Sequence, residues 1–374
     1  MLIAHVSDCY APRTGGIESQ VGDLAARQAA AGHEVHVLTA TLGAAGERGG
    51  VVDVENGVHV HRLGARLPFD LPVNPVGPRL LREAFRALAP DVVHVHAGVL
   101  SPFAYDGARI ALDLRLPTAI TWHCMLDGVV GPLRAIVSRT RWSRTPAALS
   151  AVSHEAASRV RDVFGGEVAV MPNGIDVDAW APEGPRPAHR SLRLVSTMRL
   201  APRKRAVPLV ELVGSAARRL PAEALRLSII GSGPAQARVA AAITAQGLDG
   251  VVDLRGRLTR PQVRAAYADA DVFLAPAELE AFGIAALEAR TAGLVVVARR
   301  GTGIAEFVED GVDGFLVADD AEMAEAVVRL ASEREVFEGI SAHNRSIPPA
   351  FGWDDVLGAA QAEYARARSS ARTP

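Results

Sequence analysis

Two glutamates and a glycine stand close together in the segment PAELEAFGIAALE, residues 276–288. An apolar strand pattern ends at Pro276, Glu280 lies in the following loop, Gly283 begins a helical pattern, and Glu288 falls in its second turn. Glycine lets a ligand approach the backbone, and the free N–H groups of a helix start can hold a phosphate. This order of residues predicts a loop that binds a phosphorylated ligand beside two carboxylates.

Lys204 is the only lysine among the 40 Lys and Arg residues of the chain. A strong bias toward arginine and alanine has removed lysine everywhere else. The surviving lysine indicates a site where a compact ammonium is wanted and a planar guanidinium would not fit. Chance survival is the competing interpretation.

Short apolar strands alternate with helical stretches along most of the 374 residues. This alternation predicts parallel sheets with right-handed crossovers, whose ligands bind beyond the carboxyl ends of the strands. The strands are expected at residues 2–7, 34–39, 92–96, 118–123, 149–152, 192–198, 225–230, 252–255, 272–275 and 295–298.

The pattern divides the chain into two Rossmann-like halves. We expect an N-terminal domain at residues 1–175, a Pro-rich linker at 176–190, and a C-terminal domain at 191–350. An amphipathic helix at 351–374 is expected to return to the N-terminal domain.

Residues 276–288 resemble the signature of the family 4 retaining glycosyltransferases, which have the GT-B fold. The resemblance extends over nearly the whole chain: PRTGGIE at 12–18, PNGID at 172–176, RLAPRK at 199–204, IIGSGP at 229–234, GIAE at 303–306, DGFLV at 313–317, and Phe351 with Trp353. It implies an α/β protein in which two Rossmann-like domains face a central cleft, similar to the phosphatidylinositol mannosyltransferases and related bacterial group 1 enzymes. The N-terminal domain would then lie on the acceptor side, and the C-terminal domain would bind the nucleotide-sugar.

The resemblance also implies roles for individual residues. Arg199 and Lys204 would clamp the donor diphosphate and stabilise the departing charge, because cations aimed at a developing anion lower the barrier strongly. Glu280 would face the transferred sugar, and Glu288 would bind the ribose hydroxyls. The remaining donor-binding positions would be Gly15, Gly16, Gly231, Gly283 and Ile284.

Three histidines lie at strand positions. His123 matches a family histidine that contacts the sugar and is counted with the catalytic residues, although a satisfied core histidine is the alternative. His94 and His96 share one face of a strand. A metal site would require a third ligand that the sequence does not identify, so a structural or weakly substrate-contacting role is favoured. No Asp-x-Asp motif is suited to hold a cation, so no metal or tightly bound cofactor is implied.

The expected reaction is transfer of a hexosyl group from a nucleotide-diphosphate sugar to a hydroxyl acceptor with retention of anomeric configuration. GDP-mannose is favoured over UDP-glucose and UDP-N-acetylglucosamine, and the acceptor is a small molecule, a glycan or a lipid-linked sugar. A nucleotide-sugar 2-epimerase, a non-catalytic nucleotide-sugar-binding protein and a pyridoxal-dependent phosphorylase are the alternatives. The epimerases lack the PNGID and Glu280/Glu288 context, the intact charged residues argue against a binding protein, and the phosphorylases are much longer.

A net charge of −2 provides no global field for nucleic acid. The two distant cysteines, Cys9 and Cys124, and a start without signal-peptide features predict a cytoplasmic location. Arg134, Arg139, Arg141 and Arg144 flank Trp142 and would allow peripheral contact with the inner face of a membrane, although a solvated helix face is favoured.

Overall fold

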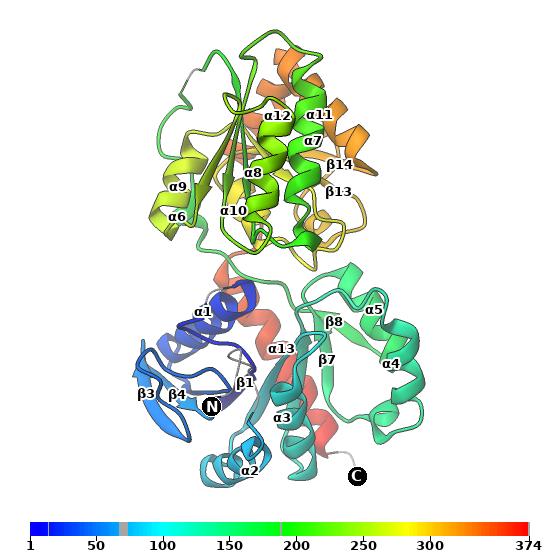
Figure 1. Ribbon diagram of the computed structural model, residues 1–374. Helices are drawn as coiled ribbons and strands as arrows, with labels where there is room; N and C mark the ends of the chain where they lie inside the picture. Colours follow the sequence, from blue (N-terminus) through cyan, green and yellow to red (C-terminus); the bar gives the residue numbers. More distant parts are fainter. Residues whose placement is uncertain (14, 67–73, 188, 373–374) are drawn as a thin grey trace. The chain divides into compact units, whose positions relative to one another are not determined.

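The structure is a computed structural model of the whole chain (Figure 1). It describes residues 1–13, 15–66, 74–187 and 189–372. Thr14 of the predicted N-terminal glycine turn and residue 188 of the expected linker lie outside the described residues.

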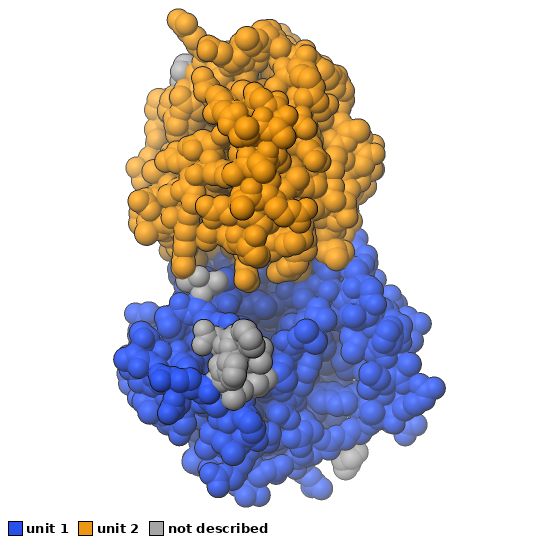
Figure 2. Space-filling view, viewed as in Figure 1, with its two compact units in different colours: residues 1–174, 353–374 blue, residues 175–352 orange. Residues whose placement is uncertain are grey.

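The chain forms two compact units, coloured separately in Figure 2. Unit 1 comprises Met1–Gly174 and Trp353–Pro374, and unit 2 comprises Ile175–Gly352. The C-terminal segment from Trp353 onward therefore belongs to the same unit as the N-terminus.

Unit 1 is built on an eight-stranded sheet of order β3-β4-β2-β1-β5-β6-β7-β8. All neighbouring strands are parallel except the β3–β4 hairpin. From β4 to β7 the order is that of a doubly wound Rossmann sheet, and the chain reverses direction across the sheet between β1 and β5. The strands are β1 (Leu2–Ser7), β2 (Glu34–Thr39), β3 (Val51–Glu55), β4 (Val58–Arg62), β5 (Val92–Ala97), β6 (Thr118–Trp122), β7 (Ala148–Ala151) and β8 (Val168–Val170).

Helices pack on both faces of this sheet. On one face α13 contacts β5, β6, β7 and α1, and Tyr364 and Ala360 are buried against Ile3 and Val92. On the other face α3 lies so close to β1 that a Cβ at Gly107 would come within 2.6 Å of Val6. The helical elements of unit 1 are α1 (Gly16–Ala30), α2 (Gly77–Leu88), α3 (Pro102–Asp113), α4 (Val130–Val137), the 3-10 helix η2 (Arg141–Arg144), α5 (His154–Phe164) and α13 (Trp353–Arg372).

Unit 2 is built on a six-stranded, fully parallel sheet of order β11-β10-β9-β12-β13-β14. This is the complete Rossmann order, with the reversal between β9 and β12. The strands are β9 (Leu192–Thr197), β10 (Leu225–Ile230), β11 (Val252–Gly256), β12 (Val272–Ala275), β13 (Val295–Arg299) and β14 (Gly314–Val317). The prediction of two Rossmann-like domains is confirmed.

Helices α7, α8 and α11 lie side by side over one face of the second sheet (Figure 1) and share its core with β9, β10 and β12. The helical elements of unit 2 are α6 (Val177–Trp180), η3 (Pro202–Lys204), α7 (Ala206–Ala217), α8 (Gln236–Ala245), α9 (Arg260–Ala268), α10 (Ile284–Thr291), η4 (Gly303–Glu306), α11 (Asp320–Ser332) and α12 (Arg334–Ser346).

Most of the segment expected as a linker is part of unit 2. Trp180 of α6 is buried and its ring lies 5.6 Å from that of Tyr267. Arg186 forms an ion pair with Asp271 at 3.2 Å and donates to the Gly293 carbonyl at 2.6 Å. The proline and polar residues of this segment suggested a linker. The contacts of Trp180 and Arg186 with unit 2 arise from tertiary structure, so the sequence did not reveal them.

Candidate functional site

The predicted donor-binding residues of unit 2 follow β9, β10 and β12, the three strands around the reversal. Arg199 and Lys204 follow β9, Gly231 follows β10, and Glu280 and Gly283 follow β12. At such a reversal the loops leave in opposite directions, which opens a crevice at the carboxyl edge of the sheet. The sheet order therefore brings these residues, distant in sequence, to one edge.

Lys204 and Glu280 meet directly at this edge. The Lys204 ammonium donates to Glu280 Oε2, and the two side chains are only 20% and 23% exposed. The short helix η3 carries the lysine, and the Gly303 N–H holds the Glu280 carbonyl at 2.8 Å. Arg199 is exposed and forms no ion pair within the described part of the chain. Among the described residues, no carboxylate pairs with its positive charge.

Gly283 begins α10 in a left-handed conformation, with φ +92°. A Cβ there would lie 2.6 Å from Cγ1 of Ile304, so both the conformation and the packing require glycine. Ile284 is the first residue of α10, and the first N–H groups of any helix lack intrahelical partners. This arrangement leaves donors at a helix start, where an anion is also favoured by the helix dipole.

Glu288 lies in the second turn of α10 and is close to Tyr267, a residue that sequence analysis missed. The buried Tyr267 hydroxyl donates to Thr197 Oγ1 at 2.9 Å, at the end of β9. Burial, followed by the nearby charge of Glu288, raises the pKa of Tyr267 well above its usual value. The same hydroxyl lies 3.4 Å from the Ala285 carbonyl of α10, so Tyr267 contacts both β9 and α10. Nothing in the sequence distinguishes it from other core aromatics.

Gly231 has a clear structural reason to be glycine. Its φ is +133°, and a Cβ would lie 1.9 Å from the Met198 carbonyl oxygen. The turn after β10 is also joined to the loop after β9, since the Leu200 N–H donates to the Ser232 carbonyl at 3.0 Å. Gly231 thus allows close approach of the two loops, whether or not its backbone also contacts a ligand.

An ion network lies near the Lys204–Glu280 pair and was not predicted. Arg205 and Arg299 both pair with Glu278, at 2.9 and 3.2 Å, and both also contact Asp320. These four residues come from the carboxyl ends of β9, β12, β13 and β14 or the loops that follow. The network joins the loops of the edge and neutralises its own charges. The sequence could not reveal it because its members are separated by up to 115 positions.

The predicted N-terminal site residues of unit 1 also lie at a carboxyl edge. Gly15 caps α1 and Gly16 is its first residue, just beyond β1. The neighbouring Asp8 is buried, and its carboxylate accepts from the Phe103 and Ala104 N–H groups at 3.1 and 3.2 Å. Burial raises the pKa of Asp8 to about 6. Asp8 thereby caps α3 and fixes the turn that leads to the glycine pair.

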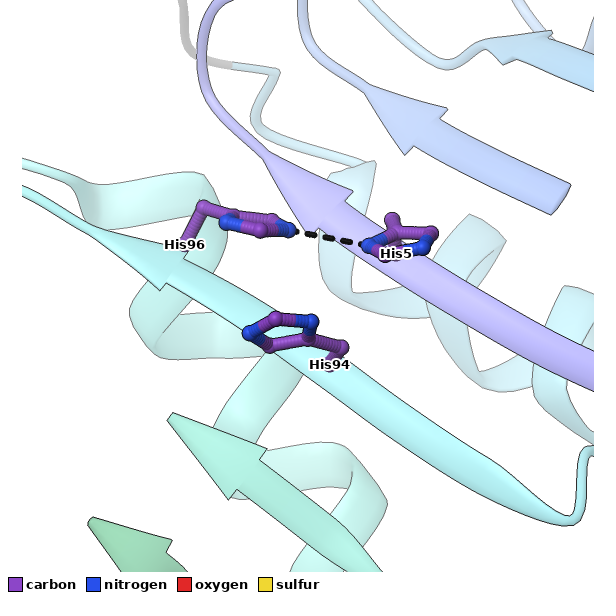
Figure 3. Close-up of side chains that lie close together, drawn as sticks. All are labelled: His5, His94 and His96. Atoms are coloured by element: carbon purple, nitrogen blue, oxygen red, sulfur yellow. Dashed lines mark hydrogen bonds between the residues drawn. The ribbon is translucent and has the colours of Figure 1, made fainter. Parts of the chain in front are cut away.

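A third histidine, which sequence analysis did not find, lies beside His94 and His96. His5 of β1 lies beside them (Figure 3), and one nitrogen from each ring falls within 4.8 Å of the others. The register pairs His5 with His94, so the three side chains share the face that α1 and α13 cover. His5 reaches this position because β1 pairs with β5, and strand periodicity alone does not predict which strands pair.

The geometry of this cluster fits hydrogen bonding better than metal coordination. His5 Nδ1 lies 2.9 Å from His96 Nε2, and His5 Nε2 lies 2.7 Å from Gln28 Oε1. His94 bonds to Tyr364 Oη at 2.9 Å and to Thr121 Oγ1 at 2.8 Å. A metal would need a lone pair from each ring. Every nitrogen of His5 and His94 already has a protein partner.

His123 continues this cluster toward the carboxyl edge. Its Nε2 lies 3.0 Å from His96 Nδ1, and its backbone N–H donates to the Ala97 carbonyl at 2.9 Å. Burial lowers the pKa values of His123 and His5 to about 4, and those of His94 and His96 well below the usual value. These rings are therefore neutral at neutral pH.

The arginines of the suggested membrane surface are exposed, but three of them contact the protein. Arg134 donates to the Asp162 carbonyl at 2.6 Å, and Arg141 pairs with Asp113 at 2.6 Å. Arg139 donates to the Ala135 carbonyl at 2.8 Å, and Arg144 is also exposed. Within the described residues, no helix combines the length and the apolar character needed to cross a membrane.

A cavity of about 380 Å³ lies at the opposite, amino edge of the unit 2 sheet. Arg186, Arg190 and Arg345 line it, together with Asp271. Arg186 is already bonded to Asp271 and to two carbonyl groups. None of the predicted site residues lines this cavity. We therefore place the candidate site at the carboxyl edge, where the charged pair and the helix start converge.

Two family descriptions match the two halves of the chain. Glycosyltransferase Family 4 matches residues 14–179, and Glycosyl transferases group 1 matches residues 191–333.

Relatives of similar length agree with these matches. A phosphatidylinositol N-acetylglucosaminyltransferase subunit of Arabidopsis thaliana is 26% identical over 97% of this chain and 81% of its own. The GDP-mannose-dependent alpha-mannosyltransferase of Mycolicibacterium smegmatis is 29% identical over 91% and 92%. Among solved structures, Alr3699/HepE of Anabaena in complex with UDP and glucose has a TM-score of 0.75 at 18% identity, covering 98% of this chain and 99% of its own. This structural likeness confirms the GT-B fold.

We predict that Gly231→Ala destabilises unit 2 by roughly 1–3 kcal/mol, because an alanine there is strained and its Cβ meets the Met198 carbonyl. Thermal unfolding of the variant measures this. Gly250→Ala is the matched control, since nothing lies within 4 Å of its added Cβ. Equal unfolding temperatures for both variants would show that packing does not require this glycine.

We predict that unit 1 loses stability as pH falls from 6.5 toward 4. His5, His94, His96 and His123 have lowered pKa values when folded, so the unfolded chain binds more protons in this range. Each of the four contributes up to about 1.4 kcal/mol per pH unit, and Asp8, with its raised pKa, offsets part of this below pH 6. The hydrogen-exchange protection of peptides from β1 and β5 measures the stability of unit 1. Unchanged protection between pH 6.5 and 4 would contradict the prediction.

Proposed function

Because the chain belongs to the group 1 and family 4 glycosyltransferases, we propose that it moves a hexosyl group from a nucleotide-diphosphate sugar to a hydroxyl acceptor with retention of configuration. The observation that carries the proposal is the Lys204–Glu280 pair, which joins the loops after β9 and β12 at the carboxyl edge of unit 2. This edge is where a Rossmann sheet binds nucleotides.

The donor diphosphate would bind between Arg199, Lys204 and the start of α10. Arg199 offers an unneutralised charge, and Lys204 would exchange part of its pairing with Glu280 for a phosphate oxygen. The N–H groups at Gly283 and Ile284 would complete the anion site. Glu280, released from the ammonium, would accept a hydrogen bond from a hydroxyl of the transferred sugar.

Glu288 would bind the ribose hydroxyls of the donor. It lies one turn beyond the helix start, on the same helix that would hold the phosphates. A carboxylate can accept hydrogen bonds from two adjacent hydroxyls. In unit 1, the Gly15–Gly16 turn and His123 are the groups that we propose contact substrate.

The proposed donor is GDP-mannose. A relative 29% identical to this chain is a GDP-mannose-dependent mannosyltransferase by name, which supports the choice. The Anabaena structure contains UDP and glucose, so a UDP-sugar is the competing donor. Relatives named for phosphatidylinositol support an inositol-containing or lipid-linked acceptor. Peripheral membrane contact through Arg134–Arg144 stays a prediction.

We predict that Lys204→Ala and Arg199→Ala each lower kcat by roughly 10²–10³, because the departing diphosphate loses a stabilising cation. Nucleoside diphosphate release measures turnover. Arg203→Ala is the matched control: Arg203 is exposed on the same short helix as Lys204 and is assigned no role. Near-normal turnover in both Lys204 and Arg199 variants, with a folded protein, would remove the assignment.

We also predict that the product keeps the anomeric configuration of the donor. The acceptor oxygen would form its bond to the anomeric carbon on the face from which the diphosphate departs, and a phosphate oxygen would take the acceptor proton. This route needs no covalent sugar–enzyme intermediate. Proton NMR of product formed early in the reaction reports the anomeric coupling, and an inverted coupling would rule the mechanism out.

A further inference from the structure

A continuous chain of buried hydrogen bonds leads from His123 into the core of unit 1. It passes from His123 to His96 and then to His5, with nitrogen–nitrogen distances of 3.0 and 2.9 Å. His5 bonds to Gln28 of α1, and Gln28 bonds to Tyr364 of α13 at 2.9 Å. His5, His96 and Tyr364 are at most 2% exposed. Bulk water is therefore excluded from the His96–His5 and Gln28–Tyr364 bonds, whereas the His123–His96 bond is only partly buried.

The direction of each bond in the chain follows from the orientation of the Gln28 amide, whose oxygen faces His5. Gln28 Oε1 can only accept, so His5 donates from Nε2. A neutral imidazole has one donor and one acceptor, so His5 Nδ1 accepts and His96 Nε2 donates. His96 Nδ1 is then an acceptor, and His123 must donate from Nε2.

The other branch is consistent with the same direction. The Gln28 amide N–H donates to Tyr364, whose hydroxyl can donate to His94 Nδ1 at 2.9 Å. His94 Nε2 then donates to Thr121 at 2.8 Å, and Thr121 bonds to Ser150 at 2.9 Å. The Ser150 hydroxyl donates to the Ile120 carbonyl, which can only accept. With Ser150 donating to this carbonyl at 3.4 Å, the hydroxyl oxygen of Ser150 accepts from Thr121, and the branch agrees with a Gln28 amide whose oxygen faces His5.

We propose that this buried chain locks His123 as the Nε2–H tautomer, so that Nδ1 presents a lone pair and accepts a hydrogen bond from a substrate hydroxyl. His96, His5 and Gln28 are then positioning residues, which act on the substrate through His123. The lowered pKa values of the four rings agree with neutral forms throughout.

The lock has a consequence for specificity. Within the described part of the chain, His123 Nδ1 has no protein partner, so it is the ring nitrogen left for a ligand. Because Nδ1 is a hydrogen-bond acceptor, it favours binding of a sugar hydroxyl, which can donate. A phosphate or carbonyl oxygen is disfavoured, because its lone pairs would face the lone pair of Nδ1. The hydroxyl contact rests on the proposed function, whereas the tautomer does not.

The test is a long-range proton–nitrogen NMR spectrum of the full chain labelled with nitrogen-15 histidine. His123→Gln identifies the His123 signals by their loss. The wild-type chain at neutral pH is expected to show His123 protonated on Nε2 and unprotonated on Nδ1. A His123 protonated on Nδ1, or on both nitrogens, would overturn the proposal.

Two substitutions of His96 test the positioning role. His96→Leu removes Nδ1 of His96, the atom that accepts the hydrogen bond from His123, so His123 should populate both tautomers. The value of kcat/KM should then fall roughly tenfold, the effect of one lost hydrogen bond. His96→Asn can place its amide oxygen where Nδ1 stood, so it should restore the tautomer and most of the lost kcat/KM. A single Nε2–H tautomer in His96→Leu would contradict the lock.

The tautomer of His123 and the proposed function are tested separately. If the wild-type chain turns over no nucleotide-sugar, the proposed function is wrong, and the spectra of the wild type and His96→Asn still decide the tautomer. If the spectra show the expected tautomers and only the kcat/KM of His96→Leu is unchanged, the hydroxyl contact to His123 is overturned.

Discussion

The reversal between β9 and β12 is the constraint on which the proposed site of unit 2 depends. Parallel pairing brings the carboxyl ends of all six strands to one edge, and at the reversal the two loops leave in opposite directions. Lys204 and Glu280, on loops 76 positions apart in sequence, meet there as an ion pair. The left-handed Gly283 then directs α10 so that its first N–H groups lie at the same edge. Each residue is ordinary alone, and their convergence makes the edge suitable for a diphosphate.

Unit 1 uses the same sheet topology for another purpose. On the face covered by α1 and α13, the strands are apolar near their amino ends, with Ile3 and Val92, and polar nearer their carboxyl ends, with His5, His94 and His96. Burying these rings is tolerable because each finds hydrogen-bond partners, which offsets the loss of water. The result is a rigid polar layer beneath His123. Such a layer can fix a proton position that a solvent-exposed histidine would not keep.

Much of this architecture could be predicted from sequence because its signals are local. Alternating strands and helices predicted ten of the fourteen strands that the described residues form, but not β3, β4, β8 or β14. The order of residues 276–288 predicted a helix start beside carboxylates. The signals failed where contacts join distant segments. His5 was missed because only the pairing of β1 with β5 places it beside His94. Tyr267 and the network of Arg205 with Asp320 were missed for the same reason. From the sequence, Gly231 was predicted to bind the donor. The structure shows that packing against the Met198 carbonyl also requires glycine there, and a sequence motif cannot distinguish these two reasons.

The most direct test of the central claim is hydrogen exchange of the full chain with and without nucleoside diphosphate. We predict slower exchange in the peptides that contain residues 199–204, 231–236 and 280–288, because an anion at the carboxyl edge orders these loops. GDP and UDP compared in parallel would also indicate the preferred base. Protection confined to the cavity lined by Arg186 and Arg345, with none in these three loops, would contradict the account.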